Sequence, residues 1–330
     1  PYLMRKMISF LKFSLPLLVG LVLLFYAFKN VQLDDFLSKL NLTRYGWIIG
    51  SMLLSLVAYV SRAYRWQLLL SAADQKVSTF RLTLAVFVGY LANLAFPRLG
   101  EVVRCAVLKK TNQIPVSLSI GTVVTERIID SLVLLFFLII ALLLEFDLIV
   151  TYFENIFSIY HIPLDGLLYA ALTLLMIFSI LVLVILRTHT PLSQRTKKMA
   201  SEVLKGILTI KSIQSKSLFL ITTTVMWLTY FLMSYMIFFA LEETSSLSLT
   251  AGFMLLVSGG IALALPVQGG IGTYHAMIAM MLGLYGIENT TGLFLATLLH
   301  SSQILSVVIF GGISLVITLG IEKNNRNDLK

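Results

Sequence analysis

Long apolar stretches separated by short polar segments dominate this chain, and their lengths predict a helical membrane protein. A helix needs roughly 20 apolar residues to cross the hydrocarbon core of a bilayer. Six stretches reach this length, at about 11–28, 47–70, 118–144, 164–186, 218–241 and 291–319. No polar segment between them is long enough to form a soluble domain, so we expect residues 1–330 to form a single transmembrane domain.

Two further apolar regions, at about 80–110 and 249–286, are each interrupted by a Pro-x-x-Gly sequence. Proline lacks a backbone N–H and clashes with the preceding helical turn, whereas glycine readily adopts positive φ. The helices should therefore break at Pro97 and at Pro266. Because non-helical backbone survives at membrane depth only inside protein or beside a wet cavity, we predict two re-entrant helical hairpins.

The order span, hairpin, span then occurs twice, in repeat 1 (about 46–144) and repeat 2 (about 218–319). The predicted fold is all-α and polytopic, with about six full spans and two re-entrant hairpins arranged as an inverted repeat. Broken helices that meet near the midplane indicate the binding site of a transporter, so we expect the two hairpin tips to approach each other. Loops of similar length without internal symmetry are the alternative explanation.

Composition and charge agree with a membrane protein and predict its orientation. The chain is 58% hydrophobic and 12% charged, with a net charge of +9. The connector 187–216 is rich in Lys and Arg and should be cytoplasmic, whereas the acidic loops at 145–163 and at Glu242-Glu243 should lie outside. Both termini then fall in the cytoplasm, the first apolar stretch is expected to be an uncleaved span of the inner membrane, and the charge does not indicate a nucleic-acid partner.

The first hairpin tip contains candidate anion ligands. The helix after Pro97 would direct its N-terminus into the membrane, where free N–H groups favour a phosphate. Arg98 lies at this tip, Arg104 lies further along the helix, and Glu101 is spaced to pair with either arginine. Direct contact with a lipid headgroup and a structural Arg–Glu bridge both remain open.

The second tip carries Gly269, Gly270 and Gly272 and has no Lys or Arg. Successive glycines can form an anion-binding nest of backbone N–H groups, but glycines also allow close helix packing in membranes. His275 follows the tip, and we interpret it as a hydrogen-bonded packing residue in preference to a proton carrier.

Three charged residues, Glu126, Arg127 and Asp130, lie inside the predicted span 118–144. Charges at this depth cannot face lipid, so the cluster is either functional or internally paired, with Arg127 spaced to pair with Asp130. Arg127 is a candidate headgroup ligand, and Glu101, Glu126 and Asp130 are candidates for proton coupling. Arg62 and Arg65 lie near the cytoplasmic end of span 47–70, and we expect them to snorkel to the interface.

These motifs, in this order, resemble a known family: Asn93…Pro97-Arg98-Leu99-Gly100-Glu101…Arg104, then Thr125-Glu126-Arg127…Asp130, then Pro266…Gly269-Gly270-Ile271-Gly272. They are similar to the transmembrane, flippase-like domain of lysylphosphatidylglycerol synthases. The resemblance implies a helical domain that moves lipids between leaflets, with Asn93 and Gly100 joining the headgroup site. It also implies a stand-alone member, since the sequence shown ends without the soluble aminoacyl-transferase domain of better-known relatives.

We therefore expect a protein that flips an anionic phospholipid or a polyprenyl-phosphate-linked lipid. No G-x-x-x-x-G-K-[ST] motif of an ATPase occurs, and neither a metal nor a cofactor is expected, with Cys105 as the single cysteine. A membrane-embedded transferase using a lipid-phosphate donor is the first alternative. A non-catalytic membrane partner of a cytoplasmic enzyme is the second, and a homo-oligomer is compatible with each of these functions.

Overall fold

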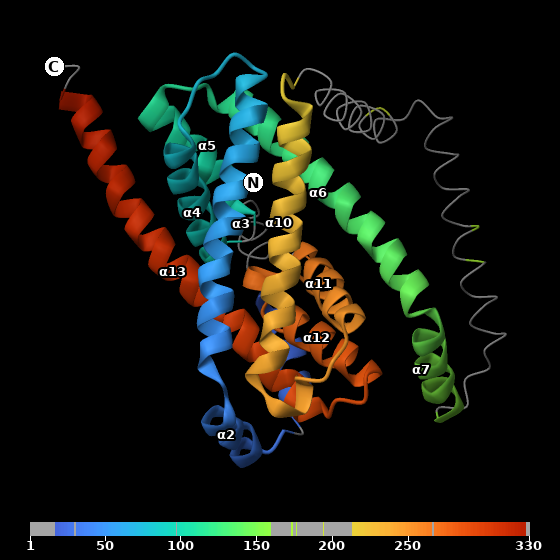
Figure 1. The fold of residues 1–330 in the computed structure, drawn as a ribbon. Coiled ribbons are helices and arrows are strands. Elements are labelled where there is room, and N and C mark those ends of the chain that lie inside the picture. The colour runs from blue at the N-terminus through green and yellow to red at the C-terminus, as the bar shows by residue number, and fades with distance from the viewer. Residues whose placement is uncertain are drawn as a thin grey trace, which may run out of the picture.

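The computed structural model describes residues 17–29, 31–96, 98–159, 213–265 and 267–327, and the single residues 173, 176 and 194. All regular secondary structure in this part of the chain is helical. Four helices are long and apolar enough to cross a membrane: α3 (Tyr45–Ser71), α6 (Val116–Leu144), α10 with η2 (Lys216–Ala240) and α13 (Asn289–Asn327). The predicted all-α polytopic membrane fold is confirmed (Figure 1).

The first predicted span is bent, and the fourth lies outside the residues that the structure describes. The first appears as a helix at Leu17–Phe28, followed by α2 (Leu33–Leu42) at an angle of 87°, and the two would count as one broken span. The predicted span 164–186 lies outside the described residues. The described residues therefore contain four candidate spans, or five with the bent pair, where the whole sequence predicts about six.

Both apolar regions that contain Pro-x-x-Gly fold as helical hairpins, as predicted. The first consists of α4 (Thr79–Ala95) and α5 (Leu99–Asn112), and the second of α11 (Leu249–Ala264) and α12 (Thr273–Leu284). The hydroxyl of a serine caps the first helix of each, since Ser78 and Ser248 accept hydrogen bonds from backbone N–H groups three residues later.

The long helices pack in a reciprocal pattern. Helices α3 and α10 lie side by side and run in opposite directions (Figure 1). The hairpin α4–α5 packs against α13, and the hairpin α11–α12 packs against α6 through α11. Each hairpin thus contacts the last long helix of the other half of the chain as well as the helices of its own half.

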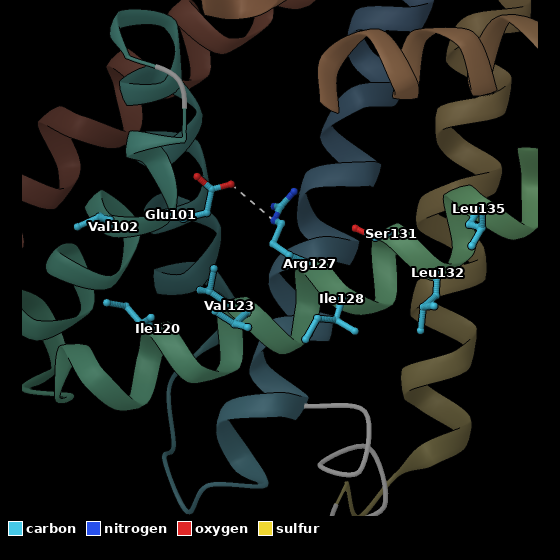
Figure 2. A pocket seen from close by; sticks show the side chains of 10 residues that line it. Glu101, Val102, Ile120, Val123, Arg127, Ile128, Ser131, Leu132 and Leu135 are labelled. Carbon is cyan, nitrogen blue, oxygen red and sulfur yellow. Dashed lines mark ion pairs between the residues drawn. The ribbon is translucent and has the colours of Figure 1, made fainter. Parts of the chain in front are cut away.

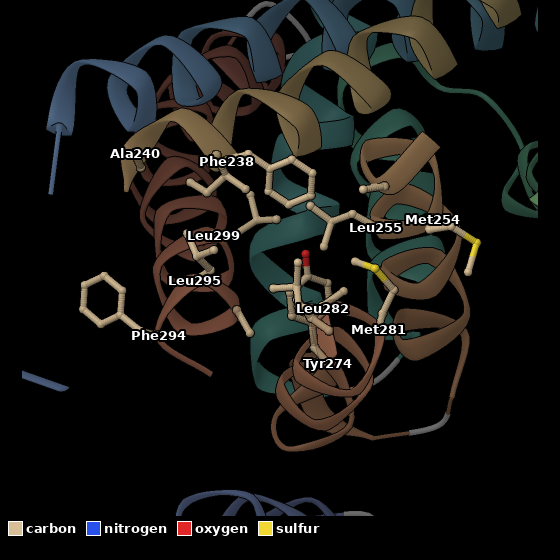
Figure 3. Close-up of a cluster of buried hydrophobic side chains, with 14 of the residues drawn as sticks. Phe238, Ala240, Met254, Leu255, Tyr274, Met281, Leu282, Phe294, Leu295 and Leu299 are labelled. Carbon is tan, nitrogen blue, oxygen red and sulfur yellow. The ribbon is translucent and has the colours of Figure 1, made fainter. Parts of the chain in front are cut away.

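A large apolar core holds the second hairpin in place (Figure 3). Phe238 of η2 (Ile237–Ala240), Leu255 of α11, Leu282 of α12 and Phe294 of α13 are all almost fully buried in it. By contrast, large apolar side chains on the outer faces of α6 and α13 are exposed, as expected for helices that face lipid.

Ion pairs fasten one end of the bundle. Lys39 of α2 lies 2.8 Å from Glu243 of η3 (Glu242–Thr244), and Arg44 lies 2.8 Å from Glu242. The hydrogen bonds from Lys39 and Thr291 lower the pKa of Glu243. Amphipathic helix α7 (Phe146–Ile159) follows α6 at this same end (Figure 1).

Candidate functional site

A buried cluster of arginines and carboxylates lies where α3, α5 and α6 meet. Helical spacing gathers these residues, since Arg62 and Arg65 are three residues apart on α3 and Glu126 and Asp130 are four apart on α6. Arg104 of α5 completes the contact between the three helices, and its guanidinium also lies on the ring of Trp66 at 4.6 Å.

Glu126 is the centre of this cluster and has no exposed surface. Its Oε1 accepts a hydrogen bond from Nη1 of Arg62 at 2.5 Å, and its Oε2 accepts one from Nη1 of Arg104 at 3.1 Å. Arg127 reaches Oε1 at 3.4 Å, and Arg65 lies 3.7 Å from it. The carboxylate of Glu126 therefore joins α6 to both α3 and α5.

Asp130 pairs with α3, which corrects one expected pairing. Its carboxylate accepts hydrogen bonds from Arg65 at 2.6 Å and from Arg62 at 3.1 Å. Arg127 was expected to pair with Asp130 along the helix, but it pairs with Glu126 and approaches Glu101 of α5 at 3.7 Å. The expected pairing is thus replaced by contacts of Asp130 with α3 and of Arg127 with Glu126 and α5.

Glu101 likewise does not pair with Arg98 or Arg104, as its spacing along the helix suggested. Among the described residues, its ion-pair partner is Arg127 on the neighbouring helix. Burial of Arg104 directs that guanidinium toward Glu126, so Glu101 is left facing α6.

The expectation that Arg62 and Arg65 snorkel to the interface is wrong. Their side chains are 4% and 0% exposed, and both point into the cluster. Their position near the end of a predicted span suggested snorkelling, but two acids inside another span require cations on a facing helix. The i, i+3 spacing of the two arginines was the signal that could have identified them.

The cluster holds more positive than negative charge. Arg62, Arg65, Arg104 and Arg127 face Glu101, Glu126 and Asp130, so one guanidinium charge is uncompensated within the cluster. Several donors also lack a hydrogen-bond partner in the described part of the chain: Nε and Nη1 of Arg65, Nη2 of Arg104, and Nε of Arg127, which lies 3.7 Å from Glu101. Buried donors left in this state favour an additional acceptor.

An open groove of about 530 Å³ between α5 and α6 leads to this excess charge. Figure 2 shows Glu101 and Arg127 facing each other beside it. The rest of its wall is almost entirely apolar and comes from α6, with one residue of α5: Val102 of α5, and Ile120, Val123, Val124, Ile128, Ser131, Leu132 and Leu135 of α6. The side chain of Arg127 is 42% exposed, so a molecule in the groove can reach a guanidinium.

The first hairpin tip is shaped by Asn93, Arg98 and Gly100. Oδ1 of Asn93 accepts a hydrogen bond from the N–H of Gly100 at 2.6 Å, which fixes the start of α5 against the end of α4. Gly100 lies so close to the carbonyl of Gly89 that a Cβ would overlap it. In this structure Asn93 and Gly100, both predicted as headgroup ligands, hold the hairpin together.

Arg98 connects the two tips. Its backbone is left-handed, with φ of 62°, and its Nη2 donates a hydrogen bond to the carbonyl of Ala264 at 3.4 Å. A cation is favourable at this place because Ala264 ends α11. The expected approach of the two tips is confirmed.

The second tip depends on glycine for its shape. Gly269, Gly270 and Gly272 all have positive φ, and a Cβ on Gly272 would overlap the carbonyl of Gly20 in the helix Leu17–Phe28. Of the two explanations for Gly272, the structure shows the close helix packing. His275 is buried as expected, but its Nδ1 has no hydrogen-bond partner among the described residues.

Comparison with known proteins identifies the family. The family model for the lysylphosphatidylglycerol synthase TM region matches residues 13–311. The chain belongs to this family. UPF0104 membrane protein MJ1595 of Methanocaldococcus jannaschii is 26% identical over 133 residues, which are 39% of this chain and 40% of that protein. No solved structure matches the chain.

The matched region of the lysylphosphatidylglycerol synthase TM family contains the whole cluster and both hairpin tips. The chain matches less than half the length of the curated relative from M. jannaschii, so that similarity supports membership of a membrane protein group alone. The geometry of the cluster is therefore the basis for the roles of individual residues.

Proposed function

We propose that this membrane protein moves an anionic phospholipid or a polyprenyl-phosphate-linked lipid between the two leaflets. The observation that carries this proposal is a buried cluster with one more guanidinium than carboxylate, whose partly exposed member Arg127 lines an apolar groove between α5 and α6. A phosphate pairs well with guanidinium donors, and removing it from water is costly without them. The protein would supply these donors inside the bilayer.

The groove is suited to hold the hydrocarbon chain of the lipid. Its apolar wall runs along the outer face of α6, where Val124, Leu132 and Leu135 are exposed to the hydrocarbon region. An acyl or prenyl chain can stay in this apolar environment while the phosphate contacts Arg127. Such a division suits a lipid better than a free anion, which would gain nothing from the apolar wall.

Alternating access would follow from an inverted repeat, which we propose for the two halves. The reciprocal packing of each hairpin on the long helix of the other half supports it, as does the opposite course of α3 and α10 (Figure 1). Rocking of one half against the other would expose the same site to each leaflet in turn.

We propose that both termini face the cytoplasm and that the membrane is the inner one. Basic residues lie at the end of α5 (Lys109, Lys110) and at the start of α10 (Lys216), whereas Glu242 and Glu243 lie at the opposite end of the bundle (Figure 1). With Cys105 replaced, a cysteine at Glu242 should react with an impermeant reagent added to intact cells.

Reconstitution into liposomes with labelled lipids tests the function. Arg127→Gln should slow translocation by about 10- to 100-fold, because a charge-assisted contact contributes about 1.5–3 kcal/mol. The matched control is Arg44→Gln, which removes an exposed arginine paired with Glu242 at the end of the bundle. Transport that is equal in the two variants contradicts a role for Arg127 in binding.

A double variant separates function from structure. If Arg127 only balances Glu101, then Arg127→Gln combined with Glu101→Gln should restore the parent rate, because neither charge is left alone. If Arg127 binds the headgroup, the double variant folds but stays slow. A new lipid product in the liposomes would favour the transferase, and neither transport nor product would favour a non-catalytic partner of a cytoplasmic enzyme.

A further inference from the structure

A second group of buried polar atoms lies beneath the second hairpin tip, apart from the arginine cluster. The rings of His275 on α12 and His300 on α13 have centroids 5.3 Å apart, and the two residues are 6% and 7% exposed. Nδ1 of His275 and Nε2 of His300 have no hydrogen-bond partner among the described residues. Two adjacent imidazoles thus each keep an unused nitrogen in the interior.

The polar strip continues along α13. Nε2 of Gln303 and Oγ of Ser306 are also buried, and neither has a partner in the part of the chain that the structure describes. Steps of three residues place His300, Gln303 and Ser306 along one side of the helix. Buried polar groups in native proteins are usually paired with protein or ordered water, so this strip is suited to hold water.

The histidine pair touches the tip that the first hairpin also contacts. His300 contacts the backbone of Gly269, and a Cβ on Gly270 would lie 3.7 Å from Cε1 of His300. Gly269 is only five positions from Ala264, whose carbonyl accepts the hydrogen bond of Arg98. A change in the position of His300 can therefore be passed along the second tip to the hydrogen bond between Ala264 and Arg98.

We propose that His275 and His300 form a proton-binding site that couples proton uptake to the position of the second hairpin tip. Imidazole is the side chain that ordinarily gains or loses its proton near neutral pH. Two positive rings at this separation repel each other, so the pair should take up one proton well before a second. The charged pair would then attract the backbone carbonyls of the tip.

The pair lies beside aromatic rings. The ring of Tyr274 lies 4.9 Å from that of His300, and the ring of Phe28 lies 6.2 Å from that of His275. The charged groups on neighbouring elements are Lys29 after Phe28, Arg98 on the first tip, and the pair of Lys39 and Glu243 where α2 and η3 meet the start of α13. Tyr59 faces α13 from α3 further along, among apolar side chains.

The acids of the arginine cluster are less suited to carry the proton. Glu126 and Asp130 accept hydrogen bonds from Arg62, Arg65 and Arg104, so guanidinium groups already occupy their carboxylate oxygens. The histidines have no such fixed counter-charge in contact among the described residues. Their protonation can therefore follow the pH on the side of the membrane to which the strip opens.

Nuclear magnetic resonance of the full chain labelled with ¹⁵N-histidine tests proton binding directly. The chain has four histidines, and His275→Gln and His300→Gln assign the two signals. We expect the parent pair to titrate in two steps separated by more than about one pH unit. In His300→Gln, His275 should titrate in a single step at a different pH. Ser301→Ala, an exposed change beside His300, should leave both steps in place.

A titration of His275 that His300→Gln leaves unchanged overturns the shared site. Two independent single steps at the same pH in the parent overturn it as well.

The coupling to transport rests on the proposed function and has its own measurement. In liposomes with an imposed pH gradient, lipid translocation by the parent and by Ser301→Ala should change with the gradient. The ratio of the rates with and without the gradient should fall to about one in His300→Gln. An unchanged ratio in that variant overturns the coupling but leaves the lipid function intact. A parent that moves no lipid under any gradient overturns the proposed function, while the titration experiment still decides proton binding.

Discussion

Nη2 of Arg98 on the first hairpin tip lies 3.4 Å from the carbonyl oxygen of Ala264 at the end of α11. The two residues are 166 positions apart, and their contact brings together two helix breaks that lie in different halves of the chain. The tip of one hairpin thus caps the helix end of the other.

Cysteine cross-linking should detect this contact. In a Cys105→Ala background, Arg98→Cys with Ala264→Cys should cross-link with reagents that span about 10 Å, the distance between packed helices. Lys110→Cys with Ala264→Cys is the control, because Lys110 lies twelve residues or about 18 Å further along α5. Equal yields for the two pairs would contradict the contact.

Removal of the central carboxylate should destabilise the protein strongly. Glu126→Ala leaves Arg62 and Arg104 buried without their shared partner, and breaking a buried ion pair costs about 3–5 kcal/mol. Thermal unfolding in detergent measures the effect. Glu288→Gln, an exposed change at the start of α13, should unfold close to the parent temperature. A parent-like Glu126→Ala would show that water or lipid already satisfies these arginines.

Close packing within the first hairpin can be tested with two glycines. Gly100→Ala should lower the unfolding temperature, because the added Cβ would overlap the carbonyl of Gly89. Gly121→Ala on α6 meets no atom within 4 Å and should be neutral or slightly stabilising, since alanine favours the helix. The order of the two unfolding temperatures is the measurement, and a reversed order contradicts the close approach.

The pair of Glu243 and Lys39 should make stability depend on acid pH. Because hydrogen bonds from Lys39 lower the pKa of Glu243 from 4.5, the pair stabilises the fold above about pH 4.5 and loses this contribution as pH falls through the lowered pKa. Glu243→Gln should therefore unfold earlier than the parent at pH 7, and the difference should shrink at pH 3. A difference that persists at pH 3 would assign the effect to packing.

Most of the fold could be predicted from the chain because membrane helices leave strong local signals. Apolar length located α3, α6, α10 and α13, and the Pro-x-x-Gly sequences located both helix breaks. The bend of 87° after the helix Leu17–Phe28 was not expected, since nothing in the apolar pattern fixes the angle between two short helices.

The site was harder to predict than the fold. Spacing within one helix suggested that Glu101 pairs with Arg98 or Arg104, and that Arg127 pairs with Asp130. In the structure Glu101 pairs with Arg127 on α6, and Asp130 pairs with arginines on α3. Arg127 also pairs with its neighbour Glu126. Such pairings depend on which faces of α3, α5 and α6 meet, and i, i+3 spacing carries no information about that. Arg62 and Arg65 were missed because their place near the end of a span suggested snorkelling, although their spacing puts both on one face of α3.

The distribution of the cluster along the chain has a consequence for biosynthesis. Glu126 and Asp130 enter the membrane with α6, and a charge at mid-helix costs about 2.5–3.5 kcal/mol on insertion. Their partners Arg62, Arg65 and Arg104 all precede α6 in the sequence, so the ribosome makes them first. When α6 leaves the translocon, its counter-ions have therefore already been synthesised. The later half of the chain can then assemble around a first half in which most charges of the cluster are paired.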